Sequence, residues 1–90
     1  MLFAVICEDK PGALELRKAN RPAHLAYLEE SGVVTQAGAF LDAADLPCGS
    51  LVILEAEDLA AAKAWAAGDP FALAGVFAKV EVRPWRRVIG

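Results

Sequence analysis

Two short apolar runs constrain the fold of this 90-residue chain more than any other feature. The first is Leu2–Cys7, which ends in the turn-forming residues 8–12, and the second is Leu51–Leu54, which lies within Ser50–Glu55. An apolar run of this length between turn residues is typical of a strand buried on both faces. The sequence therefore predicts two central strands of one sheet.

Two helices are predicted beside these strands. Residues 13–30 have a helical pattern that ends at Gly32, and Pro22 inside it should either bend the helix or start a second one. A second helix is predicted over residues 59–67, because Asp58 is a good N-cap and Gly68 follows its last turn. A short helical turn should restart after Asp69.

The edge strands are predicted from weaker signals. Residues 33–40 are rich in β-forming residues at first, and residues 41–49 read as a polar loop. Residues 76–82 alternate between two faces, and Pro84 is expected to end that strand. One face carries Val76, Ala78, Val80 and Val82, and the other carries Phe77, Lys79 and Glu81.

The predicted order is strand, helix, strand, strand, helix, strand, which is the βαββαβ ferredoxin-like α+β pattern. We expect residues 1–90 to form one domain with a four-stranded antiparallel sheet and both helices on one face. The central strands are apolar on both faces, so the other face also needs cover. A homodimer that packs sheet against sheet is the simplest answer.

Composition excludes several classes of protein. Apolar residues make up 57% of the chain, which excludes disorder, and 9 Lys+Arg against 12 Asp+Glu give a net charge of −3. We expect no nucleic-acid partner, because there is no basic field, and no membrane partner, because no apolar run is long enough to span one. The first strand starts at Leu2, so no signal peptide is expected and the predicted location is cytoplasmic.

Metal binding is also not expected. The chain has one histidine, His24, and two cysteines, Cys7 and Cys48, which are 41 positions apart. A structural zinc site usually needs four such ligands at short spacings, so we predict no metal and two reduced thiols. Cys7 belongs to the predicted core, whereas Cys48 follows Pro47 in a turn and has no clear role.

One face of the first helix carries the residues best suited to chemistry. Arg17, Arg21, His24 and Leu28 are spaced by four, three and four positions, so they share a face. Two arginines and a histidine on one stripe suit a carboxylate, an enolate or a phosphate. The alternative is a solvated face whose arginines pair with Glu15 or Glu29.

Two further side chains are candidates. Asp69 precedes Pro70, so it is a good N-cap, and its carboxylate could also orient a histidine ring and stabilise its protonated form. Ser50 follows Gly49 at the start of a strand, where its hydroxyl could bind a ligand oxygen or simply cap the turn. We predict that His24 and Asp69 lie within hydrogen-bond reach at a pocket that Arg17 or Arg21 also enters.

Together these blocks resemble the YciI-like (YCII-related domain) family. The resemblance rests on residues 16–28, 49–53, 69–77 and 82–86, which occur in the family's order over about residues 1–88. It implies a dimeric ferredoxin-like α+β barrel and a His–Asp pair at His24 and Asp69. It also implies that Arg17, Arg21 and Ser50 are pocket neighbours.

Two functions are compatible with this resemblance. The first is an isomerase, lyase or dehydrochlorinase without metal or organic cofactor, in which His24 moves a proton and Asp69 orients it. Arg17 or Arg21 would then hold a small anionic cyclic substrate and Ser50 would bind one of its oxygens. The alternative is a non-catalytic dimer that binds a small ligand, because the fold alone does not separate the two.

Overall fold

A computed structural model describes all residues, 1–90, and confirms the predicted order of elements. The strands are β1 (Leu2–Asp9), β2 (Val34–Leu41), β3 (Pro47–Glu55) and β4 (Phe77–Trp85). The helices are α1 (Leu14–Ser31), α2 (Leu59–Ala67) and the short α3 (Pro70–Leu73). The sheet is antiparallel in the order β2-β3-β1-β4, so the two most apolar strands lie at its centre as expected.

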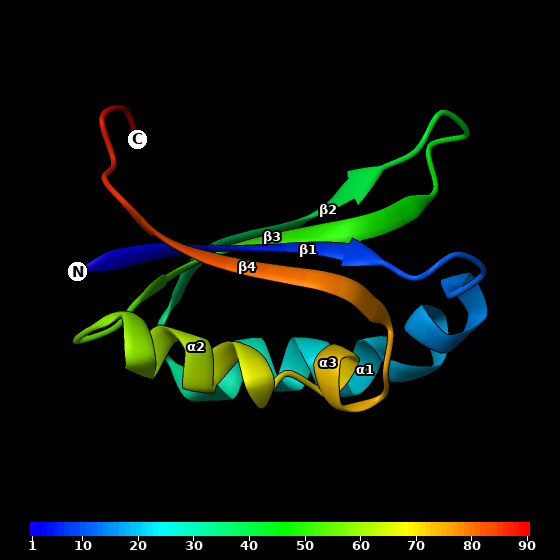
Figure 1. The fold of residues 1–90 in the computed structure, drawn as a ribbon, viewed down its shortest axis with the longest axis horizontal. Coiled ribbons are helices and arrows are strands. Elements are labelled where there is room, and N and C mark those ends of the chain that lie inside the picture. The colour runs from blue at the N-terminus through cyan, green and yellow to red at the C-terminus, as the bar shows by residue number, and fades with distance from the viewer.

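All three helices lie on the same side of the sheet, and no helix covers the opposite side (Figure 1). The main core fills the space between helices and sheet, and its buried residues come from β1, β3, α1 and α2: Phe3, Val5, Cys7, Leu28, Val52, Leu54, Ala62 and Ala66. A smaller cluster of Ala13, Phe71 and Val76 packs where α3 meets the start of α1. This second cluster anchors α3 beside the first helix.

The helix boundaries agree with the sequence prediction. Gly32 ends α1 in the left-handed conformation with φ 70°, and the Asp58 side chain accepts a hydrogen bond from Ala61 N at the start of α2. Pro22 lies inside α1, which continues past it to Ser31 as one helix. No second helix starts at Pro22, so that alternative is wrong.

Three strand predictions need correction. β3 begins at Pro47 rather than Ser50, because the hairpin turn is completed earlier by Asp42, whose carboxylate accepts from Ala44 N and Leu46 N. β4 continues through Pro84, which pairs with Phe3. A proline is tolerated there because β4 is an edge strand with no partner on its outer side.

The third correction concerns the faces of β4. The pairing register shifts between Glu8 and Asp9, so that Glu8 faces Lys79 while Asp9 faces Phe77. This bulge turns Phe77 toward the helices, where it packs against the core together with Val82. Simple alternation had placed Phe77 on the opposite face from Val82.

The open face of the sheet is apolar at its centre. Cross-strand pairing places Ile6 opposite Leu51 and Ala4 opposite Ile53 on the side away from the core residues Val5 and Val52. Phe40 at the edge of this face is 41% exposed. The prediction that the central strands are apolar on both faces is therefore confirmed.

Candidate functional site

The predicted face of α1 points into the protein. Arg17, His24 and Leu28 are all buried, and Arg21 on the same face is exposed. The solvated-face interpretation is therefore wrong for Arg17 and His24. Arg17 pairs with neither Glu15 nor Glu29; its carboxylate partner is Asp9 at the end of β1.

His24 and Asp69 form the contact that the sequence predicted. The His24 Nδ1 atom lies 2.7 Å from Asp69 Oδ1, and both side chains are buried. The same carboxylate oxygen accepts a hydrogen bond from Phe71 N at 2.9 Å, so Asp69 is also the N-cap of α3. The helix cap and the contact with the histidine therefore occur together at one carboxylate oxygen.

The hydrogen bond to Asp69 determines which ring nitrogen of His24 is free. A carboxylate only accepts hydrogen bonds, so Nδ1 must donate to it. In the neutral ring the proton then resides on Nδ1, and Nε2 is left as an acceptor. Nε2 has no hydrogen-bond partner in the chain, and His24 lines a cavity. The ring can therefore take or give a proton at Nε2.

Phe71 fixes the plane of the imidazole. The two rings are stacked with centroids 3.8 Å apart and planes inclined by 11°. The Arg17 guanidinium carbon lies 4.6 Å from the centroid of the same phenyl ring. Phe71 is 1% exposed, so it is a rigid spacer between the histidine and the arginine.

Arg17 connects three segments of the chain. Its Nη1 donates to both carboxylate oxygens of Asp9 at 2.9 and 3.0 Å, and its Nη2 donates to Gly49 O at 2.9 Å and Ser50 Oγ at 2.7 Å. Burial raises the pKa of Asp9, and the adjacent Arg17 charge partly opposes that rise. The result is a buried ion pair that holds β1, α1 and the start of β3 together.

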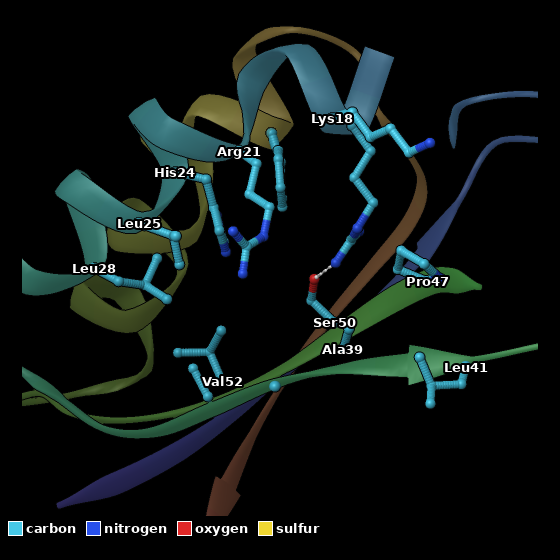
Figure 2. Close-up of a pocket in the computed structure, with 14 residues that line it drawn as sticks. Lys18, Arg21, His24, Leu25, Leu28, Ala39, Leu41, Pro47, Ser50 and Val52 are labelled. Carbon is cyan, nitrogen blue, oxygen red and sulfur yellow. Dashed lines mark hydrogen bonds between the residues drawn. The ribbon is translucent and has the colours of Figure 1, made fainter. Parts of the chain in front are cut away.

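A cavity of about 350 Å³ lies between α1 and the β2–β3 half of the sheet. In Figure 2, Arg21, His24 and Leu28 extend from α1 toward Ser50 and Val52 on β3. The lining contains no carboxylate and consists of Arg17, Lys18, Arg21, His24, Leu25, Leu28, Ala37, Gly38, Ala39, Leu41, Pro47, Ser50, Val52 and Phe71. Its polar groups are cations, an imidazole and a hydroxyl, and the rest of its wall is apolar.

The structure brings all five predicted site residues into this region. Arg17, Arg21, His24 and Ser50 line the cavity, and Asp69 lies behind His24. Sequence reasoning missed Asp9, which it assigned to a turn, and the ring contacts of Phe71. No sequence signal marks Asp9, because its burial depends on the contact with Arg17 that forms when β1 packs against α1.

No group of three or more His, Cys, Asp or Glu side chains is arranged to hold a metal ion. No helix is long and apolar enough to cross a membrane.

Comparison with known proteins identifies relatives over nearly the full chain. Protein YciI of Escherichia coli is 39% identical over an alignment of 100 positions that covers 98% of this chain and 99% of the relative. An uncharacterised Haemophilus influenzae protein is 37% identical with the same coverage. The YCII-related domain model matches residues 1–86. The chain belongs to the YCII-related domain family.

Among solved structures, one similar to this YCII-related chain has a defined activity. It is 5-chloro-2-hydroxyhydroquinone dehydrochlorinase (TftG) from Burkholderia phenoliruptrix, in complex with 2,5-dihydroxybenzoquinone. The two chains are 37% identical and superpose with a TM-score of 0.88. The alignment covers 96% of this chain and 94% of the dehydrochlorinase chain. An antibiotic biosynthesis monooxygenase with a TM-score of 0.54 and 20% identity shares the fold alone.

Proposed function

We propose that this chain is a cofactor-free enzyme that moves a proton on a small anionic ring compound. His24 acts as the general acid–base group, and Asp69 orients it. The observation that carries the proposal is the buried 2.7 Å contact between His24 Nδ1 and Asp69 Oδ1, with the other edge of the ring at a cavity. A histidine suits this task because its unperturbed pKa lies near neutral pH.

The chemistry needs only the residues around the cavity. Nε2 of His24 accepts a proton from a ring hydroxyl or from a carbon next to a carbonyl group, and the electron pair stays on the substrate as an oxyanion or enolate. The Arg21 charge and the Ser50 hydroxyl stabilise that anion. The proton can return to a different atom, which is an isomerisation. Alternatively, in a keto tautomer of the ring, the proton leaves the carbon next to a carbonyl group while chloride leaves the adjacent saturated carbon with its bonding electrons. The C–H electron pair then forms the ring double bond, which is an elimination of HCl without any oxidant.

The substrate class has two supports. The cavity lining carries cations and no carboxylate, which favours an anion, and its apolar walls suit the faces of a planar ring. The dehydrochlorinase, 37% identical to this chain, forms a complex with a cyclic quinone. We therefore propose a hydroxylated or quinone-type six-membered ring as the substrate.

The assembly that we propose is a homodimer through the open face of the sheet, where Ile6 and Leu51 lie side by side. The proposed location is the cytoplasm, where both cysteines would stay as the free thiols that the structure contains.

The proposal is tested by chloride release from 5-chloro-2-hydroxyhydroquinone, with calorimetric binding of 2,5-dihydroxybenzoquinone measured in parallel. We expect turnover by the wild type and a loss of about 100-fold or more in His24→Asn, because a positioned acid–base group contributes about 10²–10⁴. Binding should be retained in that variant. Lys63→Met, an exposed change on α2, is the control.

Binding of the quinone by the wild type without turnover of any ring substrate would contradict the proposal and would favour the non-catalytic ligand-binding alternative.

A further inference from the structure

Both terminal nitrogens of the Arg17 guanidinium are already occupied by the chain. Each makes two hydrogen bonds of 2.7–3.0 Å, to Asp9 on one side and to Gly49 and Ser50 on the other. The residue is 5% exposed, and the carboxylate of Asp9 balances its charge. This arginine therefore has little left to offer an anionic ligand, although it lines the cavity.

Ser50 is in the opposite situation. Its Oγ accepts the hydrogen bond from Arg17, but its own hydroxyl proton has no acceptor within the chain. The residue is 2% exposed and lines the cavity, where Figure 2 shows it pointing from β3 toward α1. Because Arg17 occupies one side of the oxygen as a donor, the hydroxyl proton must point away from the guanidinium. A buried hydroxyl with an unused proton needs an acceptor.

Arg21 differs from Arg17 in its exposure and in its lack of an ion-pair partner. It is exposed, and no carboxylate of the chain lies within ion-pair distance of it, yet it lines the same cavity. Its charge is therefore free to act on a ligand.

We infer that Arg17 is a positioning residue that holds Ser50 as a hydrogen-bond donor to the substrate, while Arg21 binds the negative charge. This inference rests on the proposed function and replaces the anion-binding role that helix spacing suggested for Arg17. It also narrows the substrate class. The ring must present an acceptor oxygen, a carbonyl or a deprotonated hydroxyl, to Ser50 while its reacting proton faces His24.

Binding of 2,5-dihydroxybenzoquinone by calorimetry tests the inference in the wild type, Arg17→Lys, Ser50→Ala, the double variant and Arg21→Met. Arg17→Lys and Ser50→Ala should each weaken binding about tenfold, and the double variant should bind no more weakly than either, since both remove one hydrogen bond. Arg21→Met should weaken binding and reduce its salt dependence, whereas Arg17→Lys should leave the salt dependence unchanged. Losses that multiply in the double variant would overturn the inference.

Asp9→Asn is an independent test, because the two possible roles of Arg17, positioning Ser50 or binding the anion, predict opposite changes in the affinity for the quinone. If Arg17 positions Ser50, loss of the carboxylate loosens the arginine and weakens quinone binding. If Arg17 bound the anion directly, loss of the neutralising charge would strengthen binding, and that result would overturn the inference. Circular dichroism confirms that each variant is folded, and Lys63→Met should bind as the wild type does.

If the wild type does not bind the quinone, the proposed substrate class is wrong, and the role of Arg17 is decided without a ligand. In a crystal structure of the Arg17→Lys protein, or of Asp9→Asn if the first variant does not fold, Ser50 Oγ should turn away from its present position. An unchanged Ser50 rotamer would overturn the positioning role.

Discussion

Asp69 performs two tasks with one oxygen atom, since Oδ1 accepts both from Phe71 N and from His24 Nδ1. Asparagine is as good an N-cap as aspartate, and its Oδ1 can still accept from both groups, but a neutral amide does not stabilise the positive charge that the ring gains when it takes a proton. Asp69→Asn should therefore lower turnover of the chlorinated ring substrate about 100-fold while the melting temperature changes little.

The matched control for this variant is Asp58→Asn, which alters the N-cap of α2 outside the cavity lining. It should keep full turnover. If Asp69→Asn turned over at the wild-type rate, Asp69 would be only a helix cap.

The two cysteines should differ sharply in reactivity. Burial raises the pKa of the Cys7 thiol to about 12, with the charges of Asp69 and Asp9 acting in the same direction. The reactive form is the thiolate, so Cys7 remains protonated and inert from neutral pH up to mildly alkaline pH. Cys48 is exposed. A thiol reagent at about pH 8 should modify one cysteine per folded chain, and none in Cys48→Ser. Rapid modification of Cys7 in the folded protein would contradict its placement in the core.

At the scale of elements, the start of β3 depends on a close approach of two backbones. A Cβ atom at Gly49 would lie 2.4 Å from Cys7 O on β1, and backbone does not yield easily. Gly49→Ala should therefore destabilise the fold by about 2 kcal/mol or more, measured by urea unfolding. Gly38→Ala on β2 is the control, because nothing lies within 4 Å of its Cβ. Similar stability of the two variants would contradict this packing.

Most element boundaries were predictable because they depend on local chemistry. Gly32 and Asp58 end and begin helices through contacts within a few residues, and both were identified from the sequence. The course of β4 was not, because Pro84 is tolerated only where a strand has a free outer edge. The bulge that turns Phe77 inward likewise depends on pairing with β1, which is distant in sequence.

At the scale of the molecule, the open face of the sheet predicts the oligomeric state. A depression on this face is lined by Gln36, Ala37, Gly38, Ala39, Phe40, Leu51 and Ile53. Light scattering on dilute protein should give twice the 9.5 kDa mass of one chain. Leu51→Lys, which places a charge on this face, should shift the mass toward the single chain. A wild-type mass of one chain at every concentration would contradict the dimer.

The part of the site that depends on the placement of the helices was predictable from the sequence. His24 and Asp69 are 45 positions apart, and they meet because α1 and α3 lie on the same side of the sheet. The role of Asp9 was not predictable, because a carboxylate in a turn-like sequence is usually solvated. Its burial against Arg17 follows only from the packing of β1 against α1.

The central claim is that Asp69 fixes His24 with its free nitrogen, Nε2, toward the cavity. Nitrogen-15 NMR of the single histidine tests it directly in spectra recorded at a pH where the ring is observed to be neutral. We predict a proton on Nδ1 and none on Nε2, and a loss of this preference in Asp69→Ala, which has no side-chain acceptor at this position. Addition of 2,5-dihydroxybenzoquinone should then shift the Nε2 signal more than the Nδ1 signal. A proton on Nε2 in the wild type, with Nδ1 unprotonated, would contradict the account.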